Sequence, residues 1–324
     1  MRHINNLALL VDDHFIAPLT GRPSPSQFWY APTRVTLADR VALQSYLASP
    51  NPPYTIDYSS RTAYRLLHES GAVLLRYGYG IGDQINPEAS FQAALGWHTR
   101  HLAGDAAAGE RFLSIAASFL ERQSDQGDFN YDFDWFESEA PWTSALAQAR
   151  GASVMLRAKL MTSDQRYETA ATLALSRFRQ PAAYGGYMIT FEDGALFFEE
   201  YPKRAAFTFN GFLVTLMGLF EVAHFLKNEQ AAGLLSAGLD TLERHGERFF
   251  TSWWSLYDLD RAGGLTNVHS PMYHRMICEY LQVLTLLSDR PRIGALLERA
   301  QAMDRIGSRT MATIFKLVRK AHVR

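Results

Sequence analysis

Apolar side chains recur along most of this chain with the spacing of α-helices. From about residue 60 onward the spacing predicts helices that come in pairs: 87–101 with 106–122, 141–161 with 164–178, 206–227 with 229–248, and 271–288 with 291–303. Only a few residues link the two helices of each pair, and such short links force antiparallel neighbours. The pattern therefore predicts helical hairpins.

Prolines mark where the helix pairs begin. Asn86-Pro87, Ala140-Pro141 and Ser270-Pro271 each place a proline where a first helical turn would start, a position that needs no N–H donor. The last three pairs, which begin at 141, 206 and 271, recur every 65 residues. A helical hairpin cannot bury its own apolar face, so neighbouring hairpins stack. We predict a mainly α fold, an incomplete α/α toroid of about four hairpins whose helix starts gather on one face.

Two stretches depart from the helical pattern. Residues 187–191 and 195–198 flank Glu192-Asp193-Gly194 and predict a β-hairpin. Residues 1–60 are rich in proline, with only 37–47 helical, and we expect an N-terminal arm that packs on a main domain of residues 61–324 and could contain short strands.

Composition excludes several classes of function. The net charge of −1 gives no general electrostatic attraction to nucleic acid. No uncharged run of 18 residues predicts a membrane span and no signal peptide is recognisable, so we expect a cytoplasmic protein. The basic C-terminal segment 316–324 is interpreted as a cationic helix end and solvated tail rather than as a ligand-binding tail.

Most common catalytic motifs are missing from the sequence. Histidines and the single cysteine show no metal-binding spacing, the glycines at 78–82 lack the context of a nucleotide loop, and there is no nucleophile elbow. Cys278 lies in an apolar stretch and is expected to be a buried, unreactive residue. We expect neither a metal nor another cofactor. The 15 Tyr, 20 Phe and 6 Trp exceed the needs of packing and suit a carbohydrate site.

The acids after the β-hairpin are the first candidates for chemistry. Adjacent side chains on an extended segment point to opposite sides, so one of Glu199 and Glu200 can face a cleft while the other holds the structure. The alternative is a solvated acidic pair, which the apolar neighbours of these residues disfavour. The aromatic run 253–257 either lines a groove or plugs the toroid, and Tyr273-His274 at a helix start either faces the site or is structural.

The predicted helix 141–161 carries further polar candidates. Trp142, Gln148 and Arg150 could contact a substrate. The Arg150 guanidinium could pair with a substrate carboxylate in bidentate geometry, or it could bind an acidic side chain of the protein itself. Both interpretations stay open.

An ordered set of motifs between residues 65 and 290 resembles the C-terminal domain of the D-glucuronyl C5-epimerases, which convert glucuronate to iduronate in heparan-type chains. The set comprises Asn86-Pro87, the segment 142–148, Glu199-Glu200-Tyr201-Pro202, Asn210-Gly211-Phe212, Trp254-Ser255-Leu256-Tyr257-Asp258-Leu259 and Tyr273-His274. The resemblance implies an α/α barrel, a uronate-containing polysaccharide as partner, no cofactor, and a homodimer.

The resemblance also implies residue roles. Glu200 and Tyr201 correspond to the family's active-site acid and tyrosine, and Tyr257 and Tyr273 to two further active-site tyrosines. Substrate contacts are expected from Trp142, Gln148, Arg150, Arg204, Asn210, Trp254 and His274. After Tyr257-Asp258-Leu259 the chain has Asp260-Arg261, where the animal members have an arginine directly.

These roles suit the inversion of C5 in a glucuronate residue. The C5 proton lies next to a carboxylate, so the reaction needs a base on one face, an acid on the other and cations at the carboxylate. Glu200 can act on one face, and Tyr257 or Tyr273 on the other. The alternatives are a uronate-specific lyase or glycoside hydrolase on the same scaffold, or an inactive glycan-binding homologue.

Overall fold

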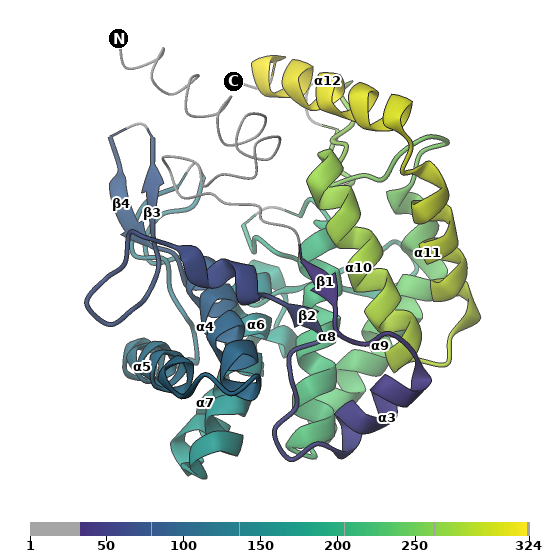
Figure 1. Ribbon diagram of the computed structural model, residues 1–324. Helices are drawn as coiled ribbons and strands as arrows, with labels where there is room; N and C mark the ends of the chain where they lie inside the picture. The colour runs from purple at the N-terminus through teal and green to yellow at the C-terminus, as the bar shows by residue number, and fades with distance from the viewer. Residues whose placement is uncertain (1–32, 79, 136, 204, 262–263, 323–324) are drawn as a thin grey trace. The chain divides into compact units, whose positions relative to one another are not determined.

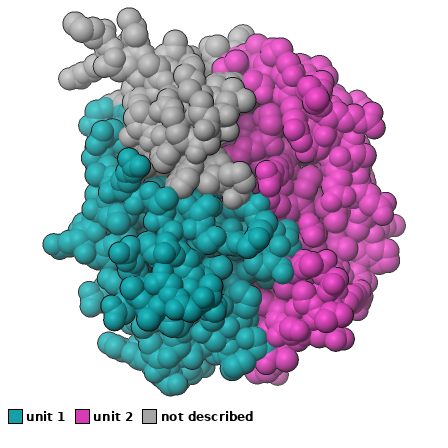
Figure 2. Space-filling view, in the orientation of Figure 1, with its two compact units in different colours: residues 1–36, 49–143, 150–174 teal, residues 37–48, 144–149, 175–324 magenta. Residues whose placement is uncertain are grey.

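The computed structural model describes residues 33–78, 80–135, 137–203, 205–261 and 264–322 (Figure 1). The chain forms two compact units, coloured separately in Figure 2. Of the described residues, unit 1 holds 33–36, 49–143 and 150–174, and unit 2 holds 37–48, 144–149 and 175–322. The proposed boundary at residue 60 stays a prediction.

Unit 1 combines short hairpins with helices. Strands β1 (Arg34–Val35) and β2 (Ile56–Asp57) pair antiparallel, as do β3 (Leu74–Tyr77) and β4 (Gly82–Ile85). Gly78 and Gly80 thus lie in the turn of the β3–β4 hairpin, and Gly82 is the first residue of β4. The helical part comprises η2 (Ser59–Ala63), α4 (Pro87–Leu102), α5 (Ala106–Arg122), most of α6 (Ala145–Thr162) and α7 (Gln165–Ala174).

Unit 2 is built mainly from helices that pack side by side. It contains α3 (Arg40–Ala48), the first turn of α6, η3 (Ser176–Arg179), η4 (Ala182–Tyr184), α8 (Phe209–Phe225), α9 (Glu229–His245), η5 (Gly246–Phe249), α10 (Pro271–Leu287), α11 (Pro291–Met303) and α12 (Ile306–His322). Its hairpin of β5 (Met188–Thr190) and β6 (Leu196–Phe198) confirms the predicted β-hairpin. Helix α10 packs on α3, α8, α11 and α12.

The mainly α fold is confirmed, and three of the predicted helix pairs pack as hairpins: α4 with α5, α8 with α9, and α10 with α11. Capping explains two of the starts, because Asn86 accepts from the Ala89 N–H at 2.7 Å and Ser270 from the Tyr273 N–H at 3.4 Å. The closure of these hairpins into a toroid stays a prediction.

Two local predictions were wrong. Helix α6 begins at Ala145, four residues after Pro141, because Trp142 is extended: its backbone pairs with that of Tyr131 and its ring stacks on the Tyr131 ring at 4.0 Å. Residues 316–322 form the end of a helix, α12, as expected, but Arg319 within it is buried and so is not part of a solvated tail.

Helix α8 is the core element of unit 2. All its residues from Phe209 to Leu219 are buried, as expected for a helix that is apolar on every side. Two polar side chains of α8, Asn210 and Glu221, hydrogen-bond with other parts of unit 2. Glu221 accepts from the Tyr46 hydroxyl of α3 at 2.8 Å. Strand β6 packs on both α8 and α9 and so directs the chain that follows it along α8.

The Tyr46–Glu221 bond predicts the effect of a single hydroxyl on stability. We expect Tyr46→Phe to lower the free energy of unfolding by about 1–3 kcal/mol, because Glu221 then has one hydrogen bond fewer in the core. Urea unfolding would measure the change. Tyr184→Phe, at a side chain that is 82% exposed, is the matched control, and equal stabilities of the two variants would contradict the prediction.

Candidate active site in unit 2

The loop that follows β6 is closed by the side chain of Glu199. This carboxylate is fully buried and accepts backbone N–H groups of Glu200 at 2.9 Å and Phe207 at 2.5 Å, with longer contacts to those of Tyr201 and Thr208 at 3.5 and 3.4 Å. Burial raises the pKa of Glu199, and the hydrogen bonds act in the opposite direction. Glu199 therefore holds the loop in place.

Glu200 lies on the opposite side of the loop and is held against α8. Its Oε2 accepts from the Asn210 amide at 3.1 Å, and its backbone carbonyl accepts from the Ala145 N–H at the start of α6. A Cβ at Gly211 would lie 2.7 Å from Glu200 Oε2. The pair Asn210-Gly211 thus supplies both a hydrogen-bond donor and the space that the carboxylate occupies. Only 5% of Glu200 is exposed.

Three tyrosines lie close to the Glu200 carboxylate. The Tyr201 hydroxyl hydrogen-bonds with Glu200, and the Tyr257 hydroxyl with Tyr201. The Tyr273 ring meets that of Tyr257 edge to face, with centroids 5.7 Å apart. All three side chains are half-buried. Unit 2 thus brings together Glu200, Tyr201, Asn210, Tyr257 and Tyr273.

Burial and nearby charge determine the protonation states of Tyr201 and Tyr257. Burial, followed by the nearby Glu200 charge, raises the pKa of Tyr201 well above its ordinary value. The same two causes, in the same order, raise the pKa of Tyr257. Both hydroxyls are therefore protonated at neutral pH and can donate protons.

The backbone of Tyr257 is anchored on both sides. Its carbonyl accepts from the Phe209 N–H at the start of α8, at 2.9 Å, and its N–H donates to the Asn267 carbonyl at 2.7 Å. The Asn267 side chain in turn donates to Asp258 at 2.7 Å. These bonds tie the Tyr257 loop to the core helix.

Lys316 of α12 brings a positive charge to this cluster. Its Nζ lies 4.7 Å from the centre of the Tyr257 ring and donates to Asn267 Oδ1 at 2.9 Å. Lys316 was not among the predicted site residues, because only the packing of α12 on α10 brings this part of the basic C-terminal segment to the cluster. The amphipathic spacing of 306–322 was the available signal.

Two residues expected at the substrate are packed inside unit 2. Trp254 is fully buried, and its indole donates to the His269 carbonyl at 2.9 Å. His274 is also fully buried, stacks on Trp254 at 3.8 Å, and bonds through its two ring nitrogens to Ser255 and the Ala300 carbonyl. His269, which the sequence analysis did not single out, lies beside both Tyr257 and Tyr273.

The other expected substrate contacts are spread over the chain. In unit 1, the Trp142 indole donates to the Phe133 carbonyl, and the buried Arg150 pairs with Glu88 and donates to the Tyr58 hydroxyl. Arg150 thus has the acidic protein partner that was one of its two interpretations. Gln148 is buried in unit 2. Arg204 lies outside the described residues.

A hollow of about 290 Å³ adjoins the Tyr257 loop in unit 2. Its lining includes Arg248, Asp258, Asp260, Arg261 and Thr266. Arg248 pairs with Glu192 at 2.9 Å. The exposed Arg261 adds a second guanidinium to the lining. This hollow offers cations beside the tyrosine cluster.

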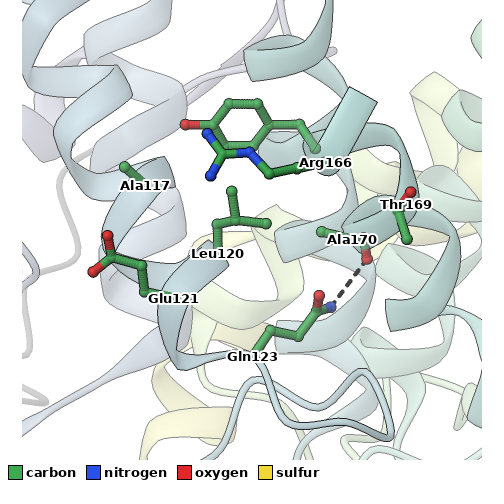
Figure 3. Close-up of a pocket in the computed structure, with 8 residues that line it drawn as sticks. Ala117, Leu120, Glu121, Gln123, Arg166, Thr169 and Ala170 are labelled. Atoms are coloured by element: carbon green, nitrogen blue, oxygen red, sulfur yellow. Dashed lines mark hydrogen bonds between the residues drawn. The ribbon is translucent and has the colours of Figure 1, made fainter. Parts of the chain in front are cut away.

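A larger hollow of about 430 Å³ lies on unit 1, between α5 and α7 (Figure 3). Its polar groups are engaged within the protein: Gln123 donates to the Ala170 carbonyl at 3.0 Å, as Figure 3 shows, and Arg166 pairs with Asp164. Glu121 is the acidic group of the lining. Arg166, Tyr167 and Thr169 complete its polar lining, but none of Glu200, Tyr201, Tyr257 and Tyr273 lies there, so unit 2 holds the better candidate site.

The described part of the chain shows no metal-binding cluster, no reactive thiol and no membrane-spanning helix. No group of three or more His, Cys, Asp or Glu side chains there could hold a metal ion. Burial raises the pKa of the half-buried Cys278 to about 12, so its thiol is protonated at neutral pH. None of the described helices is both long and apolar enough to span a membrane.

Comparison with known proteins gives several similarities. The D-glucuronyl C5-epimerase of Caenorhabditis elegans is 29% identical over an alignment that covers 46% of this chain and 27% of the worm protein. An uncharacterised protein of Methanocaldococcus jannaschii is 26% identical, with coverage of 46% and 49%. The chain thus matches less than half the length of each of these two relatives.

Among solved structures, an unsaturated glucuronyl hydrolase from Bacillus sp. GL1 is 14% identical, with a TM-score of 0.47 over 67% of this chain and 60% of that chain. This similarity is too low to carry a statement on fold or activity.

The model of one protein family matches more than half of the chain. Described as the D-glucuronyl C5-epimerase C-terminus, it spans residues 123–300 and so includes Glu200, Tyr201, Tyr257 and Tyr273. The chain therefore belongs to the family of the D-glucuronyl C5-epimerase C-terminal domain.

Proposed function

We propose that this protein inverts C5 of D-glucuronate residues in a polysaccharide and so produces L-iduronate. The observation that carries the proposal is the cluster of Glu200, Tyr201, Tyr257 and Tyr273 in unit 2 of a chain that belongs to this family. A carboxylate beside protonated hydroxyls supplies the base and the acid that inversion at C5 requires.

The resting protonation states favour one assignment of roles. Glu200 accepts the C5 proton and leaves an enediolate on the substrate. The Tyr257 hydroxyl carries a proton at neutral pH and can deliver it to the strongly basic enediolate on the opposite face of C5, as can that of its neighbour Tyr273. Glu200 is then protonated and the donor is a tyrosinate.

Tyr201 offers a path that restores the starting state. Its hydroxyl hydrogen-bonds with both Glu200 and Tyr257. The proton that Glu200 received can pass to Tyr201 while the Tyr201 proton passes to the Tyr257 oxygen. Each turnover then ends with a carboxylate and protonated hydroxyls, and the hydroxyl protons exchange with solvent before the next substrate binds, so deuterium from heavy water reaches C5.

The developing negative charge on the substrate needs nearby cations. Lys316 over the Tyr257 ring and Arg261 in the adjoining hollow are the candidates in unit 2. The substrate is an acidic polymer whose glucuronate carboxylate meets these groups, while the half-buried tyrosine rings suit the C–H faces of a sugar.

The alternatives are a uronate-specific lyase, a glycoside hydrolase and an inactive glycan-binding protein. Incubation with heparosan-like and other glucuronate polymers in deuterated water separates them. Epimerisation places deuterium at C5 of iduronate, a lyase gives an unsaturated product that absorbs in the ultraviolet, and a hydrolase gives new reducing ends without either. Binding without any product would favour the inactive homologue.

The family also suggests a homodimer, and we propose this state for the protein in solution. Light scattering on the intact chain tests it, with a monomer mass as the contrary result. The cytoplasmic location expected from the sequence stays a prediction.

The assignment of Glu200 as base predicts the effect of one isosteric change. Glu200→Gln keeps the size of the side chain and an oxygen for Asn210 but removes the basic carboxylate, so C5 deuterium exchange should fall about 10²-fold or more. Exchange is followed by NMR on the polymer. Glu298→Gln, an exposed change on α11, is the control and should keep full activity. Wild-type exchange in Glu200→Gln would remove the assignment.

The tyrosine assignment makes a separate prediction. Tyr273→Phe and Tyr257→Phe remove proton donors while keeping the aromatic contact between the rings, so kcat for exchange should drop about 10²-fold in the variant that lacks the acid. The KM for the polymer should change little. Tyr184→Phe on the surface serves as the control. Unchanged kcat in both site variants would show that neither tyrosine donates the proton.

A further inference from the structure

A chain of hydrogen bonds beneath the tyrosine cluster joins two buried histidines through one serine. His274 Nε2 lies 3.0 Å from the Ala300 carbonyl oxygen, and His274 Nδ1 lies 2.6 Å from Ser255 Oγ. The same Ser255 Oγ lies 2.9 Å from Nδ1 of His269. All three side chains are fully buried.

The chemistry of each group determines which atom donates the proton in each hydrogen bond of this series. A carbonyl oxygen only accepts, so His274 Nε2 carries its proton. Burial lowers the pKa of His274, so the ring is neutral and its Nδ1 is an acceptor. Ser255 has a single hydroxyl proton, which it must donate to His274 Nδ1. The bond between Ser255 and His269 therefore uses the proton on His269 Nδ1.

His269 is left with an unprotonated Nε2. Burial and the charge of Lys316 lower the pKa of His269 well below its ordinary value, so this nitrogen carries a lone pair at neutral pH. The atom is buried and makes no hydrogen bond to any of the residues that the structure describes. A buried acceptor without a donor is unfavourable, and this one belongs to a ring beside Tyr257 and Tyr273, so a tyrosine hydroxyl that approached it would form a favourable hydrogen bond.

Tyr273 is the hydroxyl-bearing side chain that best suits this acceptor. Its ring lies nearly parallel to that of His269, at 16° and 6.2 Å between centroids. The Ser270 cap, whose hydroxyl accepts from the Tyr273 N–H, holds both residues at the start of α10. The Tyr257 ring is edge-on to that of His269, at 74°, and so is less well aligned with the plane of the imidazole.

We propose that His269 is a positioning residue of the active site, whose Nε2 lone pair accepts the Tyr273 hydroxyl proton in a hydrogen bond when substrate is bound. The Ser255–His274 pair acts behind it by holding His269 in the Nδ1–H tautomer. No proton is transferred to His269 in this role. In this arrangement the single Tyr273 proton is directed to His269, so Tyr257 is the hydroxyl that delivers a proton to C5. The expected effect on turnover rests on the proposed C5 reaction, whereas the tautomer of His269 follows from its hydrogen bonds alone.

The tautomer can be measured without any substrate. Nitrogen-15 NMR of the full chain labelled at histidine should show His269 protonated at Nδ1 and His274 protonated at Nε2. Ser255→Ala should release His269 from the single tautomer while the protein stays folded. An Nε2–H tautomer of His269 in the wild-type protein would overturn the proposal.

A pair of substitutions tests the role in turnover. Asn at position 269 places an amide N–H near the Nδ1 position but has no atom at Nε2, whereas the Gln amide oxygen reaches the Nε2 position. We expect His269→Asn to lower kcat for C5 exchange roughly five- to tenfold, at nearly constant KM, and His269→Gln to recover most of the loss. Equal losses in both variants, or none, would contradict the positioning role.

The partner is tested by a binding experiment. Addition of a glucuronate polymer should shift the His269 Nε2 resonance in the wild-type protein and not in Tyr273→Phe. A shift of the same size in both would exclude Tyr273 as the donor. If the wild-type protein exchanges no C5 proton in any polymer, the proposed reaction fails, whereas the tautomer and binding results still decide on the His269 bond.

Discussion

The buried carboxylate of Glu199 is the interaction on which the site depends. It collects the N–H groups of Glu200 and Phe207, with longer contacts to those of Tyr201 and Thr208. A buried anion is stable only when hydrogen bonds compensate for the lost water, and the backbone groups of the loop would themselves be costly without an acceptor. This mutual satisfaction closes the loop after β6 and turns Glu200 toward Asn210 on the buried core helix α8.

Burial also separates the roles of the ionisable groups in the cluster. Burial and the negative charge of Glu200 both raise the pKa of Tyr201 and of Tyr257, so the two hydroxyls keep their protons. In this hydrogen-bonded series the Glu200 carboxylate can accept a proton and the tyrosine hydroxyls can donate one. The same physical effect leaves His269 and His274 uncharged, so they can order hydroxyl groups without competing for the proton of a substrate.

The helix at the end of the chain shows how distant segments complete this cluster. Lys316 of α12 reaches the Tyr257 ring and the Asn267 amide, which in turn holds Asp258. Lys316 thus stabilises the Tyr257 loop through Asn267 and also places a positive charge near Tyr257. The outward side of α12 carries apolar residues such as Ile314 and Val318, while its cations Lys316 and Arg319 contact the protein. Amphipathic spacing alone does not reveal which face turns inward.

The sequence by itself determined the mainly α class, most helix bounds and the β-hairpin before Glu199, because capping, helix-starting prolines and apolar spacing act locally. Motif order also pointed to Glu200, Tyr201, Tyr257 and Tyr273, which the family match includes. Only the tertiary structure decided which polar residues are already paired inside the protein, as His274 and Trp254 are. It alone placed Lys316 and the His269 lone pair beside the tyrosines, since burial and hydrogen-bond direction depend on groups far apart in the chain.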